Sequence, residues 1–243
     1  MRGFFTALAF LTRLPVPRAL LGDAQDLASV APWLPAAGVL VGGLVAAAVA
    51  LGSLADPWIG AILGLLAWVL VTGGLHLDGL SDVADGLGAA HGDKERFVAV
   101  ARDPHLGSFG AMAIGLQIAA KLVLLAALAG TATGGALAGS LVLAAAWARW
   151  AALALGRAVP PLTDGLASRL AAGIKTRTVA ITGTLLGAVT LYFAPVLIAA
   201  LPLTALAALY WRTRLGGMTG DCHGATIEVM ETLLLLLLAV SLP

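Results

Sequence analysis

The stretch LHLDGLSDVADGLGAAHGDKERFVAVARD, from Leu75 to Asp103, is the most acidic part of a chain that is otherwise apolar almost throughout. Read as a helix from Leu75, it places Asp78, Asp82 and Asp85 at positions i, i+4 and i+7, within about 60° of one another on one face. Carboxylates this close raise one another's pKa, because each disfavours the charge of its neighbours. A hard divalent cation, which prefers oxygen ligands, is the natural partner for such a face.

A second short helix is predicted after Gly92 and Asp93, and it ends at Asp103, because Pro104 disfavours helical geometry in the residue before it. Asp103 is then free to turn toward the first three carboxylates. The following residues, which include His105, form a polar and flexible entry to the next apolar segment. The stretch therefore predicts a metal site made of Asp78, Asp82, Asp85 and Asp103.

The composition predicts an integral membrane protein. Of the 243 residues, 60% are hydrophobic and 11% are charged, and the mean hydropathy is +0.99, which leaves too little polar surface for a soluble globule. The net charge of +1 excludes the basic excess that is typical of a nucleic-acid binder. A single cysteine, Cys222, excludes internal disulfides. We expect an all-α transmembrane bundle that forms one domain over residues 1–243.

Apolar runs long enough to cross a bilayer predict seven spans, with six as the alternative because Pro195 and Pro202 interrupt two of them. The predicted spans are 35–55, 57–77, 110–130, 134–155, 179–195, 196–211 and 224–241. Residues 1–20 are predicted to form an interfacial amphipathic helix and not a cleaved signal.

The placement of charge orients the bundle. Twelve of the fourteen Lys and Arg residues lie in the segments 1–34, 78–109, 156–178 and 212–223, whereas the tight connections near 55–57, 130–134 and 194–195 contain none. The positive-inside rule then places the N-terminus and the acidic stretch on the cytoplasmic side and the C-terminus outside. The other two basic residues, Lys121 and Arg149, lie inside spans, where a charge usually faces a cavity or a partner. Snorkelling to the membrane surface is an equal alternative for Arg149.

A second polar constellation is GGMTGDCHGATIEVMET, residues 216–232. Its glycines before Asp221, Gly220 among them, are typical of a tight turn whose N–H groups can face a phosphate. Asp221 is a candidate metal ligand or general base, or a simple helix cap. His223 is either a ligand or a structural histidine, and Glu228 and Glu231 place acids on the last helix.

The spacing of the first stretch resembles the motif D-x-x-D-G-x-x-A-R…G-x-x-x-D-x-x-x-D of the CDP-alcohol phosphotransferases. Asp82, Asp85, Gly86 and Asp103 match it, whereas Ala90 replaces the Arg, Ala99 the later Gly and Gly107 the last Asp. That last Asp is thought to be the base in those enzymes, so the resemblance implies related chemistry with a base from elsewhere.

Four motifs in order, FLTRLPVP, HLDGLSDVADG, RDPHLGSFG and GGMTGDCHGA, resemble the adenosylcobinamide-GDP ribazoletransferases, also called cobalamin synthases, along essentially the whole chain. The resemblance implies a multi-pass inner-membrane enzyme, dependent on Mg²⁺, with its active site facing the cytoplasm. It would join adenosylcobinamide-GDP to α-ribazole or its 5′-phosphate and release GMP. A CDP-alcohol phosphotransferase of lipid synthesis and a proton-coupled transporter are the alternatives.

Residues and resemblance together predict the roles in the site. The four aspartates would hold Mg²⁺, and Asp221, with Asp78 second, would be the base. The predicted partners are the two substrates and the lipid bilayer, with no nucleic acid and with a homo-oligomer left open. The predicted substrate-binding residues are Gly79, Gly86, Arg102, His105, Lys121, Arg149, Arg157, Gly220, His223 and Glu228.

Overall fold

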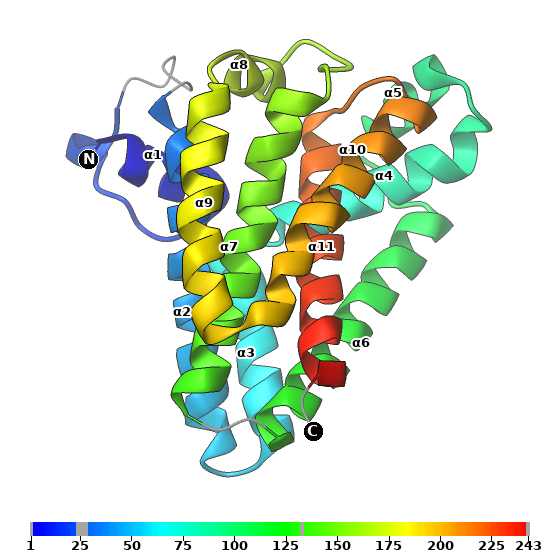
Figure 1. Ribbon diagram of the computed structural model, residues 1–243. Coiled ribbons are helices and arrows are strands. Elements are labelled where there is room, and N and C mark those ends of the chain that lie inside the picture. The colour runs from blue at the N-terminus through cyan, green and yellow to red at the C-terminus, as the bar shows by residue number, and fades with distance from the viewer. Residues whose placement is uncertain (1, 23–28, 132–133, 242–243) are drawn as a thin grey trace.

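A computed structural model describes residues 2–22, 29–131 and 134–241, and within them the predicted all-α class is confirmed (Figure 1). Met1 and residues 23–28 of the predicted N-terminal segment lie outside the described residues. Seven apolar helices run alternately in opposite directions, namely α2 (Leu34–Ser53), α3 (Pro57–Thr72), α6 (Ser108–Thr131), α7 (Gly135–Ala158), α9 (Thr176–Phe193), α10 (Ala200–Arg214) and α11 (Gly220–Ser241). Four shorter helices gather toward one end, namely α1 (Arg2–Leu11), α4 (Leu75–Ala90), α5 (Lys94–Ala101) and α8 (Leu166–Ala172).

Within the described residues, five helical segments are long and apolar enough to cross a membrane, or six if a bent pair counts as one span, so the predicted alternative of six fits and seven does not. They are Ala31–Ser53, Ser108–Thr131, Gly135–Ala158, Pro195–Arg214 and Gly220–Ser241. The sixth would be α3 and α4 together, which are bent by 84°. The helix α9 is only 18 residues long and contains Arg177 and five threonines, which lower its hydropathy.

The bend between α3 and α4 decides where the acidic helix lies. Asp56 caps α3 by accepting a hydrogen bond from the Trp58 N–H at 2.8 Å, and Pro57 fits the first turn. The helix ends at Gly73 and Gly74, which both have positive φ, at +63° and +70°. The span predicted at 57–77 therefore stops at Thr72, and α4 runs across the bundle instead of along it (Figure 1).

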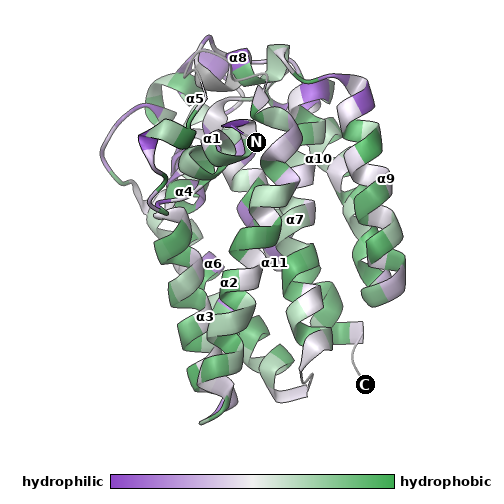
Figure 2. Cartoon of the chain, turned by 90° about the vertical axis from the view of Figure 1, so that its left-hand side faces the viewer, coloured by the Kyte–Doolittle hydropathy of each residue, from purple (hydrophilic) through white to green (hydrophobic). Residues whose placement is uncertain are grey.

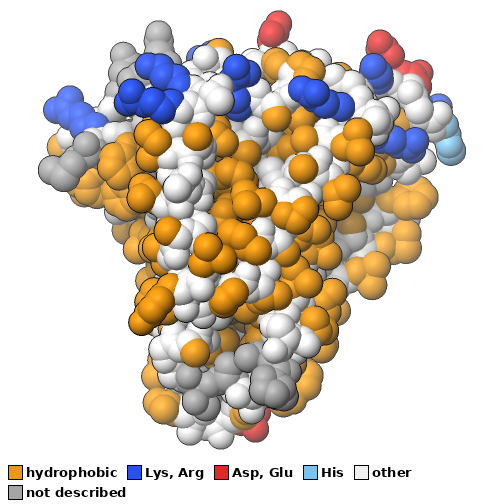
Figure 3. All heavy atoms as spheres, in the orientation of Figure 1, with side chains coloured by type: hydrophobic (Ala, Val, Ile, Leu, Met, Phe, Trp, Pro, Cys, Tyr) orange, Lys and Arg blue, Asp and Glu red, His pale blue; other side chains and the backbone are white. Residues whose placement is uncertain are grey.

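Hydropathy divides the molecule into an apolar body and one polar end (Figure 2). The body exposes large apolar side chains on several helices. Leu51, Leu70, Leu116 and Leu185, for example, are 64–73% exposed. Lys and Arg side chains gather at the polar end, above the apolar surface (Figure 3). An apolar body of this kind suits a hydrocarbon surrounding, so the protein is an integral membrane protein.

Small residues let the helices approach closely. A Cβ at Gly38 would lie 2.6 Å from the Ala145 carbonyl oxygen, and one at Gly42 would lie 2.6 Å from the Val142 Cα, so α2 packs backbone to backbone on α7. At Gly60 a Cβ would lie 2.8 Å from the Val49 carbonyl oxygen, which brings α3 against α2 in the same way.

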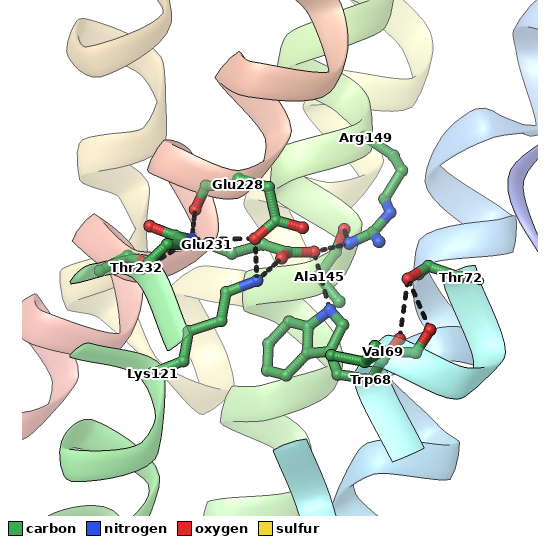
Figure 4. A network of polar contacts seen from close by, with 10 residues as sticks. Trp68, Val69, Thr72, Lys121, Ala145, Arg149, Glu228, Glu231 and Thr232 are labelled. Carbon is green, nitrogen blue, oxygen red and sulfur yellow. Dashed lines mark hydrogen bonds and ion pairs between the residues drawn. The ribbon is translucent and has the colours of Figure 1, made fainter. Parts of the chain in front are cut away.

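Four charged side chains meet in the middle of the bundle (Figure 4). Glu231 of α11, which is 0% exposed, pairs with Lys121 of α6 and Arg149 of α7 and accepts a hydrogen bond from the Trp68 indole of α3 at 3.1 Å. Glu228 lies 2.6 Å from the Lys121 ammonium. Two cations thus face two carboxylates, and one cluster ties α11 to three other helices.

Loss of the Glu231 charge is expected to destabilise the protein. Glu231→Gln leaves Lys121 and Arg149 with one carboxylate between them, and breaking a buried ion pair costs about 3–5 kcal/mol. Thermal unfolding in detergent should show a clearly lower midpoint, whereas Glu95→Gln on the exposed surface of α5 should not change it.

A double variant separates charge balance from lost hydrogen bonds. Adding Lys121→Gln to Glu231→Gln restores the balance between buried cations and carboxylates, so we expect part of the stability to return. If the double variant is less stable than Glu231→Gln alone, charge balance is not what the cluster provides.

Candidate functional site

The predicted acidic face is present on α4, which begins at Leu75 as expected. Asp78 is exposed, and Asp82 and Asp85 are half-buried. Burial, followed by the nearby charges of Asp78, Asp221 and Asp85, raises the pKa of Asp82 to about 6. Because these carboxylates oppose one another's ionisation, a cation bound among them would be favourable.

Asp221 reaches this face because Gly79 allows close packing. A Cβ at Gly79 would lie 3.0 Å from the Asp221 carbonyl oxygen and 3.1 Å from its Cα, so the first turn of α11 rests on the backbone of α4. Asp221 is also among the charges that act on Asp82, and Arg102 is close enough to act on Asp221. The two acidic constellations of the sequence therefore meet in space.

Asp85 holds the start of α6. Its two carboxylate oxygens accept hydrogen bonds from the N–H groups of Gly107, at 2.8 Å, and Gly110, at 2.9 Å. A Cβ at either glycine would come within 2.3 Å of an Asp85 oxygen. Gly107, where the phosphotransferase motif has its last Asp, is thus the residue that lets Asp85 approach the N–H groups of the next helix.

Asp103 faces its own loop. Its carboxylate accepts a hydrogen bond from the His105 N–H at 3.0 Å and lies 2.6 Å from the His105 ring nitrogen Nδ1, and both contacts hold the pKa of Asp103 below its usual range. Both side chains are exposed. Among the described residues, no three His, Cys, Asp or Glu side chains are grouped closely enough to hold a metal ion, so the predicted four-aspartate site is not assembled here.

Gly86 serves helix packing. A Cβ there would lie 2.8 Å from the Phe97 ring, and this close contact brings α5 against α4. Next to this contact, the Lys94 side chain of α5 extends to the backbone of Gly216. A Cβ added at Gly216 would lie 2.8 Å from the Lys94 ammonium. The acidic segment and the segment before α11 are therefore neighbours.

A basic groove of about 730 Å³ opens at the same end of the molecule. Arg157, Lys175 and Arg212 line it, and its floor includes the end of α7 and part of α8. The Arg157 Nε donates to the Thr176 hydroxyl at 3.1 Å, and the Arg212 Nε donates to the Ala158 carbonyl at 3.1 Å. Only Arg157 of the three was predicted to bind substrate.

Backbone pairing fixes this groove next to α11. The Met218 N–H donates to the Pro160 carbonyl at 3.0 Å, and the Leu162 N–H donates to the Met218 carbonyl at 2.8 Å. The predicted basic segments 156–178 and 212–223 are thereby joined just before Asp221. Because α4 and α5 belong to a third basic segment, 78–109, three of the four basic segments lie together at this end.

Three predicted substrate-binding residues, Lys121, Arg149 and Glu228, lie in the buried charge cluster described above. Gly220 and His223 line a second cavity, of about 260 Å³, together with Asp221, Arg149 and His76. Sequence reasoning did not single out His76, Lys175 or Arg212. A signal that could have identified His76 is its place in the HLDGLSDVADG motif, two residues before Asp78.

The comparisons with known proteins agree along the whole chain. A family model described as cobalamin-5-phosphate synthase matches residues 3–239. The adenosylcobinamide-GDP ribazoletransferase of Thiobacillus denitrificans is 47% identical and covers 100% of this chain and 96% of the relative. Those of Novosphingobium aromaticivorans and Laribacter hongkongensis are 45% and 48% identical, each with at least 97% of the relative covered. The chain belongs to the adenosylcobinamide-GDP ribazoletransferase family.

This membership confirms the predicted family and the predicted activity, a transferase of cobalamin biosynthesis. The CDP-alcohol phosphotransferase and transporter alternatives find no support among these relatives. No solved structure matches the chain.

The contact at Gly79 yields a test of the site's geometry. Gly79→Ala forces a methyl group against the Asp221 backbone and should displace the first turn of α11, which we expect to lower cobalamin formation at least about tenfold. Gly115→Ala in α6 is the matched control, because nothing lies within 4 Å of its added Cβ. Equal activity of the two variants in membrane preparations would contradict the role of this contact.

Proposed function

We propose that the meeting point of α4 and α11 is the active site of adenosylcobinamide-GDP ribazoletransfer, with Mg²⁺ as its cofactor. The observation that carries this proposal is the approach of Asp221 to the Asp78 and Asp82 face, beside a groove lined by three basic side chains. Carboxylates for a cation and cations for a diphosphate are what a phosphotransfer between two large substrates needs.

The carboxylates divide between two tasks. Asp78 and Asp82 fit cation binding, because they lie one helical turn apart and Asp82 is already disfavoured as a free anion. Asp85 supports them, since its oxygens fix the start of α6 against α4. Asp103 would join the ligands only through a movement of its loop. These carboxylates would hold Mg²⁺, which would supply positive charge to offset that of the diphosphate and the departing GMP.

Asp221 is the base that we favour, with Asp78 second. A hydroxyl of α-ribazole, or of its 5′-phosphate, attacks the phosphorus on the cobinamide side of the diphosphate. The new O–P bond forms as the bond to the GMP oxygen breaks, and the hydroxyl proton passes to the Asp221 carboxylate. Arg102, close to Asp221, is placed to keep the phosphate near this carboxylate.

Phosphate binding is assigned to the groove and not to the buried cations. Arg157, Lys175 and Arg212 face a solvent-open groove, and guanidinium and ammonium groups suit phosphate oxygens. Lys121 and Arg149 are instead paired with Glu228 and Glu231 inside the bundle. We therefore propose that these two cations fix α11 and do not clamp the diphosphate.

Removal of single charges tests these roles. Asp221→Asn should lower kcat at least about hundredfold, because a general base contributes this much or more. Asp82→Asn should raise the Mg²⁺ concentration needed for half-maximal activity, and chelation of Mg²⁺ should abolish product formation reversibly. Asp56→Asn, at the opposite end of the bundle, keeps an equally good helix cap and should leave the activity unchanged. Near-normal activity of both Asp82→Asn and Asp221→Asn would disprove the proposed site.

We propose in addition that the polar end faces the cytoplasm, because the basic segments gather there (Figure 3). Thiol labelling tests this orientation cleanly, since the native Cys222 is buried. A cysteine at Glu95 should resist a membrane-impermeant maleimide in intact cells and react in inverted vesicles. A cysteine at Ala55, in the exposed turn at the other end, should show the reverse. Exchanged patterns would overturn the orientation.

A further inference from the structure

The second cavity lies deeper than the basic groove and differs from it in character. It measures about 260 Å³ and is enclosed by parts of α1, α2, α4, α7, α8 and α11. Its wall is mostly apolar, and the large contributors are Phe10, Leu11, Leu34, Leu170, Ile174 and Ile227. A wall of this kind favours an apolar, aromatic or aliphatic group over a phosphate.

Two side chains bring unused hydrogen-bonding groups to this cavity. His76 is 3% exposed, and neither of its ring nitrogens has a partner among the described residues. Arg149 is 1% exposed, and although one of its terminal nitrogens pairs with Glu231, its Nε and its other terminal nitrogen have no partner there. A buried polar group without a partner is costly, so this pair marks a place where a ligand is expected to supply an acceptor.

The cavity connects the parts of the proposed active site. Asp221 and Gly220 form part of its wall, and Gly156, Ala171 and Ile174 line both the cavity and the basic groove. A ligand that fills the cavity would therefore extend past Asp221 toward the cations of the groove.

We propose that this cavity binds the aromatic base of the acceptor nucleoside, with an unprotonated ring nitrogen accepting a hydrogen bond from His76. The proposal rests on the proposed function. The apolar walls cover the faces of the base, a neutral imidazole supplies one N–H donor, and Arg149 supplies further donors beside it. The ribose then lies next to Asp221, and a 5′-phosphate points to Arg157 and its neighbours. A lipid acyl chain would fill the apolar space but would leave these donors unpaired.

Two probes of the same shape test the hydrogen bond. Benzimidazole carries a free acceptor nitrogen in its ring, and indole has a C–H in that place. With the full-length protein in nanodiscs, titration calorimetry should show benzimidazole binding about tenfold more tightly than indole, as one hydrogen bond in a dry site predicts. His76→Phe keeps the aromatic volume and removes both nitrogens, so this preference should fall to about twofold or less.

The same variant distinguishes a ligand-binding role from a structural one. Because the nitrogens of His76 have no protein partner, His76→Phe should keep or raise the thermal midpoint while it weakens benzimidazole. Ala171→Phe, which narrows the passage between cavity and groove, should also weaken benzimidazole binding. Ala172→Phe, next to it but lining the groove only, should not.

Equal affinity of the wild type for benzimidazole and indole, or an unchanged preference in His76→Phe, would overturn the proposed base site. Cobalamin formation by Asp82→Asn and Asp221→Asn is measured in parallel. If both variants lose activity and the two probes bind alike, the base site is wrong and the proposed function stands. If benzimidazole is preferred and both variants keep near-normal activity, the proposed function is wrong and the base site stands.

Discussion

The arrangement of this protein depends on neutralising four charges in the middle of an apolar bundle. Lys121, Arg149, Glu228 and Glu231 are at most 3% exposed, so each must meet an opposite charge in one geometry. That geometry fixes the rotation and height of α11 relative to α3, α6 and α7 (Figure 4). Asp221 stands ten residues before Glu231 on the same helix, about 15 Å along its axis. The position of this buried cluster thus determines where the proposed base lies.

The second constraint is the sharp bend after α3. Two glycines with positive φ turn the chain by 84°, and this turn places α4 across the end of the bundle where α11 begins. The packing of Gly79 on Asp221 is then possible only because the helices cross there without side chains between them. Had α3 continued straight, Asp78 and Asp82 would lie beyond the bundle, away from the first turn of α11. The bend therefore converts two separate acidic motifs into one site.

Local patterns predicted much of this. The spacing of the aspartates predicted the helix that begins at Leu75, and the placement of the basic residues predicted one polar end. The four motifs predicted the family. What the sequence did not show was which polar groups are satisfied inside the protein. Lys121 and Glu228 are 107 residues apart, and Asp85 and Gly107 are 22 apart, so their pairing depends on the packing of whole helices. Lys121 looked available for phosphate because its partner could not be identified from spacing alone.

The same reasoning explains why the structure fits the predicted alternative of six spans at most and not seven. Hydropathy detected the apolar runs at 57–77 and 179–195, but not that Gly73 ends the first or that the second belongs to a helix that begins at Thr176 and includes Arg177. A short or less apolar helix is tolerated in such a bundle when its neighbours cover it, and α3 lies against α2 and α6 along its length.

The proposed site joins two unlike surfaces. One is a groove with cations and open access to solvent, and the other is an apolar cavity with unpaired donors, which Asp221 lines. A nucleoside or nucleotide is itself divided in this way, with an aromatic base at one end and hydroxyls or a phosphate at the other. An acceptor bound across both surfaces has its sugar held at the carboxylate by its two ends, and this orientation lowers the barrier without any strong contact to the reacting hydroxyl. The separation of polar groove and apolar cavity is thus what would make Asp221, and not another aspartate of the cluster, the residue beside the attacking oxygen.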